Sequence, residues 1–571
     1  MYHRNSHYAY FTVIVLCLFL LACNNSEHNS TTKEKQIVTN PNDMDEVTTD
    51  NIEAALSFAV ANAGKVDDTI KLQMVKAVEA FYKSSKYKPV WSKKEKWEPL
   101  ADTLFSFIKN AELQGLFPKE YHDKNLQSLK HTLDTDSLKR MDAVLWTKAD
   151  LMLTDGFMYA IYHLKHGRLQ PDSLSLNKDS VLAENFFAAT LKTVLEKKEF
   201  TSTLNTLQPK HKGYWDLKNG IKRFLDSMDR RTYTYVTYPY KKGDVKDSTF
   251  FIKNLQKRLA ESNCIDFVNK MPDSSQLSNA VKKYQKNKGL KTDGKVSTAL
   301  IKTLNISDAE RFKRIAITLD KYKQMPEKMP EKYIWVNLPG YYLQVWDKDT
   351  LALESKVICG KPETRTPLLT SKITDMVTYP TWTVPTSIIV KQYLPKLKNN
   401  PNYLSRLGLR LVNGKGQTIS GSDVNWAKYS KGIPYRIMQG SGDNNALGVF
   451  KFNFNNPYSV YLHDTNQRYL FKNSSRALSH GCVRVQEWEK LAFYIARNDS
   501  MNTKPTDTLK YNTDSIKNWI AQKENHRLDV KHQIPLYIRY LSCEGKDGKI
   551  KFYDDMYGED KLLREKYFGN K

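Results

Sequence analysis

The sequence predicts a multidomain α+β protein with a helical first half, a small three-helix module and a β-rich final domain that contains an insertion. Three observations support this class. The chain has 571 residues, more than one hydrophobic core usually accommodates. Apolar residues recur every three or four positions from about residue 67 to residue 231, as they do in amphipathic helices. After Lys332, apolar and polar residues alternate instead, which is typical of strands.

The N-terminus has the pattern of an export signal. Arg4 precedes the apolar run YFTVIVLCLFLL, which is too short to span a membrane comfortably. The run leads into LLAC, ending at Cys23, and this resembles the lipobox of bacterial lipoproteins. The resemblance implies a signal peptide over residues 1–22, cleavage before Cys23 and attachment of lipid to Cys23. An ordinary signal anchor with a chance cysteine is the alternative.

The stretch after Cys23 is polar, and residues 23–66 are predicted to be a flexible tether from the lipidated cysteine. The protein is therefore expected to be exported, to lie on the periplasmic side of the envelope and to be held at a membrane by its N-terminal lipid. Asn24 gives no strong cue for retention at the inner membrane, which favours the outer membrane.

The formal net charge of +26 does not indicate a nucleic-acid partner, because the lysines are spread over the chain without an arginine-rich block between aromatics. A solvated lysine-rich surface accounts for the charge, and weak attraction to anionic envelope polymers is the alternative.

Apart from Cys17 and Cys23, the cysteines are widely spaced and do not suggest a disulfide framework; they are Cys264, Cys359, Cys482 and Cys543. Without a CxxC pair or an HExxH motif, no metal or cofactor is expected.

The predicted helical domain spans residues 67–237. Segments KLQMVKAVEAFYKSSKYKPVW and LADTLFSFIKNAELQGLFPKEYH have helical spacing, interrupted at Gly115 and Pro118. The segment AVLWTKADLMLTDGFMYAIYHLKHG predicts another amphipathic helix that ends near Gly167. No residue cluster in this domain suggests catalysis. The following YPYKKGDVKD indicates a linker.

Residues 248–305 form a predicted three-helix module. The helix SSQLSNAVKKYQKN is followed by GLKTDG, and this pattern resembles the peptidoglycan-binding helical module. The residues that carry the resemblance include Tyr284, Gln285, Asp293 and Gly294. A generic three-helix spacer is the alternative. Residues 306–331 are predicted to form a linker helix.

The β-rich domain is predicted over residues 332–500, with an insertion at 385–435 and a C-terminal extension at 501–571. YIWVNLPGYYLQVWDKDTLALESKVICGK alternates apolar and polar residues around turn sequences, as β-hairpins do. In the extension, PLYIRYLSC and KIKFYDD return to a strand pattern. They are expected to add to the same sheet.

The block YLHDTNQRYLFKNSSRALSHGCVRV carries the chemistry. His463 lies 19 positions before Cys482. A thiol near its ordinary pKa of about 8.5 is mostly protonated at neutral pH, so it needs a base or a positive charge beside it. An imidazole titrates in the right range to accept the thiol proton and return it to a leaving amine. Cys482 is the predicted nucleophile and His463 the predicted general base.

The run Ser479-His480-Gly481 leads directly into Cys482. Glycine lets the backbone turn sharply and bring amide N–H groups toward a carbonyl under attack, as an oxyanion hole requires. Ser479, His480 and Gly481 are therefore predicted to shape the oxyanion and substrate-carbonyl site.

The segment from His463 to Arg484 resembles the signature of the YkuD-type catalytic domain, which is H-x(14–17)-[S/T]-H-G-C-h-[R/N]. Here 15 residues separate His463 from Ser479. The flanking NALGVFKFNFNNPYSVYLHDTN and YPTWTVPTSI are similar to the YcbB-like murein L,D-transpeptidases. The resemblance implies a helical scaffold, a peptidoglycan-binding-like module and a β-rich catalytic domain with a lid. It also implies that the backbone carbonyl of Asp464 orients the imidazole, and a Cys–His–Asp triad through the Asp464 side chain is the alternative. Arg484 is expected to position the loop or bind a substrate carboxylate, or else to form a structural pair.

The resemblance implies a peptidoglycan L,D-transpeptidase whose partners are stem peptides: a donor tetrapeptide and an acceptor amine. Cys482 would form a thioester and a second stem would resolve it to a 3→3 cross-link. Sensitivity to carbapenems is implied as well. Two alternatives stay open: an L,D-carboxypeptidase or cross-link hydrolase using the same site, and a catalytically silent wall-anchoring lipoprotein. Acceptor identity, the ratio of transfer to hydrolysis and the oligomeric state are not readable from the sequence.

The insertion at 385–435 is longer than a simple strand connection requires. It contains a short helical pattern, IIVKQYLPKLK, and a glycine-rich turn. Apolar residues such as Leu394, Leu397 and Trp426 favour a folded lid over a disordered excursion. A lid over Cys482 would keep water from the thioester.

Overall fold

The computed structural model describes residues 35–568 except 177–181, 183, 238–247, 267–269, 505, 507 and 508. The predicted signal peptide, Cys23 and the first part of the tether lie outside the described residues. Among the residues described, no helix combines the length and the apolar character needed to cross a membrane.

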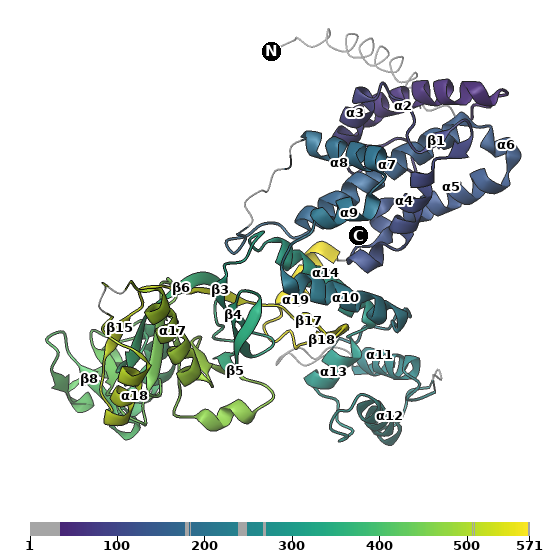
Figure 1. The fold of residues 1–571 in the computed structure, drawn as a ribbon. Coiled ribbons are helices and arrows are strands. Elements are labelled where there is room, and N and C mark those ends of the chain that lie inside the picture. Colours follow the sequence, from purple (N-terminus) through teal and green to yellow (C-terminus); the bar gives the residue numbers. More distant parts are fainter. Residues whose placement is uncertain are drawn as a thin grey trace, which may run out of the picture. The chain divides into compact units, whose positions relative to one another are not determined.

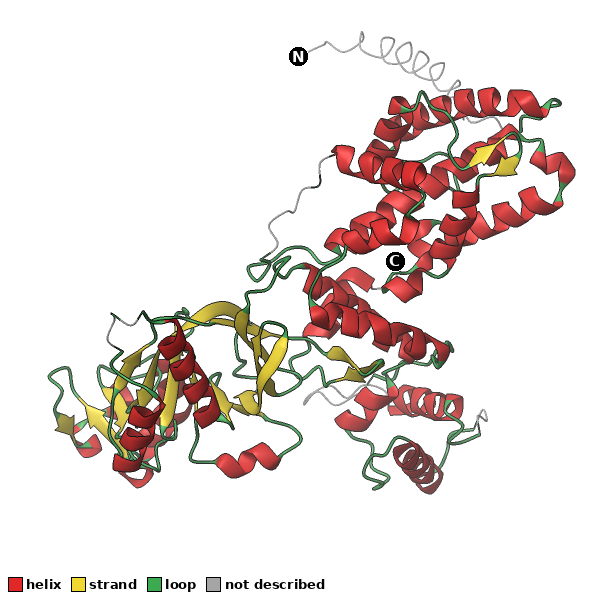
Figure 2. Cartoon of the chain, in the orientation of Figure 1, coloured by secondary structure: helices red, strands yellow, loops and turns green. Residues whose placement is uncertain are grey.

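The chain divides into two compact units (Figures 1 and 2). Unit 1 comprises Met1–Glu112, Leu116–Leu164 and Val181–Leu207, and unit 2 comprises Leu113–Gly115, Lys165–Ser180 and Gln208–Lys571. Figure 2 shows that unit 1 is almost entirely helical, whereas unit 2 contains the main sheet together with further helices. The predicted class, a multidomain α+β protein with a helical first half and a β-rich catalytic half, is confirmed.

Unit 1 is a helical bundle with one two-stranded ribbon. Its elements are α2 (Met44–Ala61), α3 (Val75–Ser84), β1 (Ser92–Lys93), β2 (Lys96–Trp97), α4 (Pro99–Lys109), α5 (Asp123–Thr135), α6 (Ser137–Arg140), α7 (Ala143–His166), α8 (Glu184–Lys197) and α9 (Phe200–Thr206). Helix α7 runs through the centre, and it is buried on nearly every side. The sequence predicts an amphipathic helix here, but the neighbouring helices cover its polar face too.

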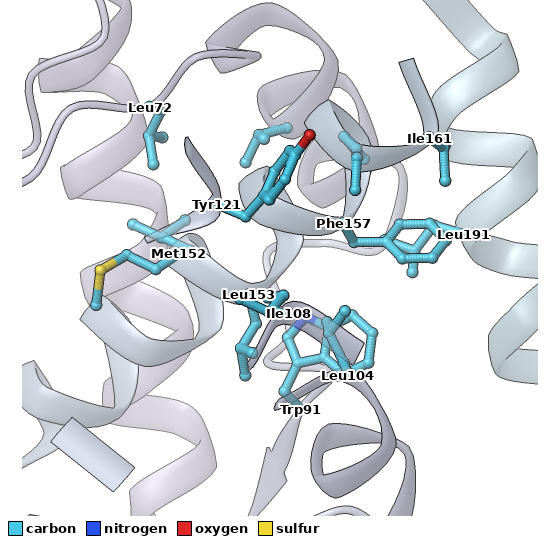
Figure 3. Packing of buried hydrophobic residues seen from close by; sticks show 14 of the residues in the cluster. Leu72, Trp91, Leu104, Ile108, Tyr121, Met152, Leu153, Phe157, Ile161 and Leu191 are labelled. Atoms are coloured by element: carbon cyan, nitrogen blue, oxygen red, sulfur yellow. The ribbon is translucent and has the colours of Figure 1, made fainter. Parts of the chain in front are cut away.

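The core of unit 1 gathers around α7 (Figure 3). Trp91 and Phe157 are fully buried in it, together with leucines and isoleucines of α4 and α7. One polar group inside this core is well satisfied: the Asp150 carboxylate accepts hydrogen bonds from the Val90 and Trp91 amides at 3.1 and 3.0 Å. Burial raises the pKa of Asp150 to about 6.

Helix α2 corrects the predicted tether. Residues 44–61 are helical, and Ile52, Leu56 and Ala59 are buried in the core of unit 1. The prediction of a flexible tether as far as residue 66 is therefore wrong for this segment. These apolar residues recur at spacings of four and three, but they follow a long polar run that obscures the helical period.

Unit 2 contains the three-helix module and the helices that border it. They are α10 (Lys212–Asp226), α11 (Ser248–Glu261), α12 (Ser274–Asn287), α13 (Thr298–Leu304) and α14 (Asp308–Lys323). A small core of the module includes Leu255, Val281, Tyr284 and Leu300. A capping box at Asp273 and Gln276 begins α12.

The main sheet of unit 2 closes on itself. Its strands are β3 (Lys332–Asn337), β4 (Tyr342–Asp347), β5 (Thr350–Gly360), β6 (Leu369–Thr378), β11 (Phe450–Phe454), β12 (Leu462–His463), β13 (Ala477–Ser479), β14 (Val483–Val485), β15 (Arg527–Asp529) and β16 (Pro535–Arg539). They pair in the order β11-β12-β14-β5-β4-β3-β16-β6-β15, and β6 also pairs with β11. This last pairing closes the strands from β11 to β6 into a ring, with β15 beside β6, so it protects strands that would otherwise form open edges.

The C-terminal segment contributes to this sheet and also departs from it. Strand β16 lies between β3 and β6, parallel to β3. The later segment KIKFYDD does not join the sheet as predicted, because β18 (Lys549–Phe552) pairs with β17 (Cys543–Lys546) in a separate hairpin that packs against α10. Helices α17 (Trp488–Asn502), α18 (Thr513–Gln522) and α19 (Glu559–Phe568) complete the unit.

The insertion after β6 is a folded subdomain. It has its own sheet in the order β7-β10-β8-β9, formed by β7 (Trp382–Thr383), β8 (Leu409–Val412), β9 (Thr418–Ile419) and β10 (Arg436–Gln439). Two short helices, α15 (Thr386–Ile388) and α16 (Leu394–Asn399), flank a π-helical turn at Ile389–Tyr393. Leu394, Leu397 and Trp426 are buried in its separate apolar core, which a disordered excursion would lack.

Candidate active site

Three charged or titratable side chains form a row across adjacent strands. Lys451 of β11 is the register partner of His463 of β12, and His463 is in turn the partner of Arg484 of β14. Directly paired residues project from the same face of a sheet, so the three side chains lie on one face. Cys482 immediately precedes β14, and the Val483 amide donates to the Tyr461 carbonyl at 3.1 Å. The predicted nucleophile and base therefore come from neighbouring parallel strands.

Cys482 differs from the other described thiols. Cys264, Cys359 and Cys543 are buried, whereas Cys482 is partly exposed, and all four are unpaired thiols. Burial raises the pKa of both Cys359 and Cys543 to about 12, so these two thiols are poor nucleophiles. Cys482 thus combines a reactive setting with access.

The environment of Cys482 contains groups that raise the pKa of its thiol and groups that lower it. Desolvation raises the pKa of its thiol, and a hydrogen bond from Tyr461 together with the charges of Lys451 and Arg484 lowers it. The net shift is upward. The resting thiol is therefore neutral, and to act as a nucleophile it would have to lose its proton to a base.

His463 offers a neutral imidazole for that role. It is buried, and burial together with the nearby Arg484 lowers its pKa to about 3, so the imidazole is neutral at physiological pH. The carbonyls of Asp464 and Leu447 favour its protonated form. Nδ1 is nevertheless buried without a hydrogen-bond partner among the described residues. The orienting role of the Asp464 carbonyl therefore stays a prediction.

The Asp464 side chain is engaged elsewhere. Its carboxylate accepts from the Val449 amide at 3.0 Å and from the Arg468 guanidinium at 3.0 and 2.6 Å. Gly448 packs so closely against this carboxylate that a Cβ there would approach Oδ2 to 2.3 Å. The side chain therefore stabilises the strand connection, and a Cys–His–Asp triad is not formed.

The turn before Cys482 is held by side-chain hydrogen bonds. The Ser479 hydroxyl donates to the Cys482 carbonyl at 2.6 Å and accepts from the Gly481 amide at 3.1 Å. Thr366 donates to the Gly481 carbonyl at 2.7 Å, and Gly481 has a φ of 126°, which strains any other residue. Ser479 and Gly481 thus position the nucleophile. The Gly481 amide is engaged with Ser479 here, so its predicted part in an oxyanion hole stays a prediction.

His480 and Arg484 border the site. His480 is exposed, and desolvation, Lys361 and Arg484 lower its pKa. Its ring makes a close contact with Gln392 of the insertion. Arg484 donates to Gln467 at 3.0 Å, but its Nε is buried without a partner among the described residues. This guanidinium therefore has a donor to offer a substrate.

Sequence reasoning missed three residues at the site. Tyr461 and the charge of Lys451 both act to lower the pKa of the Cys482 thiol, and Trp382 of β7 acts to lower the pKa of Tyr461. Tyr461 lies two positions before His463, which on a strand places it on the same face, so alternation could have found it. Lys451 and Trp382 carry no such signal, because their proximity depends on strand pairing and on the insertion.

The four residues singled out in the three-helix module make internal contacts. Tyr284 and Gln285 are buried. The Gln285 amide donates to Asp293 at 2.9 Å and its carbonyl accepts from the Gly294 amide at 2.9 Å. The hydrogen bonds of Gln285 thus hold the loop after α12 in place, and the role of these four residues in ligand binding remains a prediction.

Across the described ranges, no group of three His, Cys, Asp or Glu side chains is placed to hold a metal ion.

The closed sheet and this site belong to a known class of domain. Residues 331–511 match the L,D-transpeptidase catalytic domain, YkuD, and residues 76–220 match a Scaffold domain. The chain therefore carries a YkuD-type L,D-transpeptidase catalytic domain together with a scaffold domain, which confirms the resemblance drawn from the sequence.

Individual proteins are similar to parts of this chain. A curated Haemophilus influenzae protein (strain ATCC 51907 / DSM 11121 / KW20 / Rd), provisionally named an L,D-transpeptidase, is 34% identical over 230 residues. The match spans 40% of this chain and less than half, 45%, of that protein. Among solved structures, the catalytic domain of an E. faecium L,D-transpeptidase acylated by ertapenem is 13% identical, covering 37% of this chain and 99% of that chain at a TM-score of 0.17. An L,D-transpeptidase from Mycobacterium smegmatis is 11% identical, covering 37% and 58% at a TM-score of 0.17.

The coupling of Lys451 to Cys482 predicts a pH effect. Replacing Lys451 by Met removes a positive charge that lowers the pKa of the thiol, so that pKa should rise. Below the pKa, alkylation follows the thiolate fraction, and its rate at a fixed pH should fall roughly threefold. Iodoacetamide labelling of Cys482 across pH 6–10, read by peptide mass mapping, measures this. Lys451→Arg should keep the profile, as should Lys549→Met in the distant hairpin; an unshifted profile in Lys451→Met would contradict the coupling.

Proposed function

We propose that the protein is a peptidoglycan L,D-transpeptidase that forms 3→3 cross-links between stem peptides through a thioester on Cys482. The observation that carries this proposal is the pairing of a partly exposed thiol with a neutral, buried imidazole inside a YkuD-type domain. Lys451 and Arg484 add positive charge in the same row, where an oxyanion or a substrate carboxylate would be stabilised.

The first step is acylation. The Cys482 sulfur attacks the carbonyl carbon between the third and fourth residues of a tetrapeptide stem, while His463 takes the thiol proton. His463 then gives that proton to the leaving nitrogen, so the C–N bond breaks, D-Ala departs and a thioester remains. Covalent catalysis of this kind divides one difficult exchange into two easier ones.

The second step transfers the acyl group. The side-chain amine of a second stem attacks the thioester carbon and loses a proton to His463. The C–S bond breaks, a new amide joins the two stems, and the sulfur recovers its proton. Water in place of the amine would give the hydrolysed tripeptide, so exclusion of water decides between a transpeptidase and an L,D-carboxypeptidase.

The insertion supports transfer over hydrolysis. It is folded around its own core, and two side chains connect it to the site: Gln392 touches His480, and Trp382 of the flanking strand β7 lies close enough to Tyr461 to act on the pKa of that phenol. A cover attached at these points would shield the thioester until an acceptor amine arrives. We therefore assign the insertion the role of a lid.

Cys482→Ala should abolish both thioester formation and cross-linking while keeping the fold, since a partly buried thiol packs as a small apolar group. His463→Ala should slow acylation by roughly a hundred- to ten-thousand-fold, the usual value of a positioned proton acceptor. Intact-mass analysis with a carbapenem and with tetrapeptide muropeptides measures both. Cys264→Ala is the matched thiol control, and His480→Ala should be milder than His463→Ala. An adduct on Cys359 or Cys543, or dimers made by Cys482→Ala, would contradict the assignment.

Replacing residues 387–432 by a short Gly/Ser linker tests the lid. Carbapenem acylation of Cys482 should persist, cross-linking should fall steeply, and the hydrolysed tripeptide should rise in proportion. Gln392→Ala, which removes only one contact with the site, should move the product ratio in the same direction by a smaller amount. Chromatography of muropeptide products gives both quantities. Normal cross-linking by the shortened protein would rule out a lid.

We also propose that the protein is exported and anchored by lipid on Cys23, in the outer membrane. The LLAC pattern after an apolar run supports this. Cys23→Ala should prevent lipidation and leave the protein soluble or signal-anchored. Metabolic labelling with a fatty acid and fractionation of the envelope test it, with Cys17→Ala as the control. Label retained in Cys23→Ala would refute the lipobox.

A further inference from the structure

The outer face of the β3–β4 hairpin carries an aromatic stripe. On both strands the alternate residues point into the sheet core, where Ile334, Val336, Leu343 and Val345 are fully buried. The opposite face carries six residues, of which Trp335 and Asn337 are buried and the others partly exposed; they are Tyr333, Trp335, Asn337, Tyr342, Gln344 and Trp346. Outward positions of a solvated sheet are mostly polar, so aromatic rings at four of these six positions, three of them partly exposed, indicate a binding surface.

This stripe forms one wall of a large cavity. The cavity has a volume of about 870 Å³, and its other walls are the start of α10, the end of α14 and the β17–β18 hairpin. All these elements belong to unit 2. None of the residues assigned to the candidate active site lines this cavity. It is therefore a separate site.

The aromatic rings are arranged together with polar groups. Tyr333 and Trp346 are cross-strand partners whose rings are within 16° of parallel, with centroids 6.5 Å apart. Beside them, Gln344 accepts from the Trp346 indole at 3.2 Å and donates to Glu354 at 2.7 Å. At the other end, Glu544 accepts hydrogen bonds from the Tyr342 and Tyr553 hydroxyls. Flat apolar faces thus alternate with carboxylate and amide groups.

His211 brings an unsatisfied donor to the wall. Its Nδ1 accepts from the Gly213 amide at 3.0 Å, which leaves the proton of the neutral ring on Nε2. Burial lowers its pKa to about 4, so the ring is neutral at physiological pH. The ring packs against Tyr322 and Trp335, with centroids 4.7 and 5.6 Å away. Nε2 is buried and has no acceptor among the described residues, so a ligand oxygen would complete it.

The charges of the cavity balance. Although the chain has a net charge of +26, carboxylates and lysines line this cavity in nearly equal numbers. Some are paired with each other: Lys212 lies 2.5 Å from Asp216, and Lys210 lies 3.3 Å from Glu327. Nearly balanced charges give the site no strong net electrostatic potential that would attract an anion. It suits a neutral ligand with many hydroxyl or amide groups.

We infer that this cavity binds a neutral N-acetylated amino-sugar chain, the glycan strand of the wall polymer, at a site separate from Cys482. A pyranose ring has a face of C–H groups that packs on aromatic rings and a rim of hydroxyl and acetamido groups that bond to carboxylates, amides and an imidazole N–H. Stem peptides carry free carboxylates, which the balanced charge does not favour. The identity of the sugar rests on the proposed function. The neutral, aromatic character of the site does not.

Calorimetric titration with the pentamer of N-acetylglucosamine tests the inference. The host is the full chain carrying Cys482→Ala, so that no turnover occurs. The pentamer should bind, and Tyr333→Ala and Trp346→Ala should each weaken binding about tenfold. Trp346→Phe, which keeps an aromatic face, should retain most of the affinity. Tyr458→Ala, an exposed tyrosine (58% exposed) outside the cavity, should leave it unchanged.

Several outcomes would overturn the inference. Absence of pentamer binding by the host would do so, as would equal binding by all the variants, which would locate the sugar elsewhere. Displacement of the pentamer by a sugar-free tetrapeptide would identify a peptide groove instead. Carbapenem acylation of Cys482, measured in parallel on the Tyr333 and Trp346 variants of the otherwise native chain, should be unchanged. Failed acylation in the native chain would count against the proposed function, whereas failed pentamer binding would count against this cavity.

Discussion

The parallel pairing of β12 with β14 is the contact on which the active site depends. It places His463 beside Arg484 and brings Cys482, one residue before β14, into the same neighbourhood. The 19-residue separation must be closed by folding, and the hydrogen bond from Val483 to Tyr461 is part of what closes it. Loop closure costs entropy that the strand hydrogen bonds and the core around Leu462 and Val483 offset. Without this pairing, the thiol and the imidazole would be two unrelated side chains.

Burial then determines the resting protonation state of the pair. Desolvation raises the pKa of the thiol and lowers that of the imidazole, so the site rests as a neutral thiol beside a neutral base. This differs from a preformed thiolate–imidazolium pair, because here the ionic form would be poorly solvated. Lys451 and Arg484 reduce the cost of negative charge on sulfur without abolishing it. A neutral thiol is also less prone to oxidation, since the thiolate is the reactive form.

Two sites of unit 2 show how one sheet serves different purposes. At the β11–β12–β14 side, residues of neighbouring strands bring the predicted nucleophile and base together, and the insertion and its flanking strand approach them through Gln392 and Trp382. At the β3–β4 side, the inward positions build the core and the outward positions present Tyr333 and Trp346 to a cavity. The period of two along a strand allows both, because alternate residues face opposite directions. A closed sheet also keeps both regions rigid, since its strands have few open edges.

The sequence by itself determined the fold class and the catalytic domain, and it predicted the two central residues, because periodicity is a local property and the S-H-G-C run is contiguous. It could not show that residues 44–61 pack as a helix, that α7 is buried on nearly every side, or that Asp464 bonds to Arg468 instead of His463. Those outcomes depend on which surfaces meet. The proximity of Lys451 to Cys482 and the cavity beside β3 and β4 could not be predicted from the sequence either. Each depends on contacts between residues that lie far apart in the chain. Only the tertiary structure decided these, through strand register and burial.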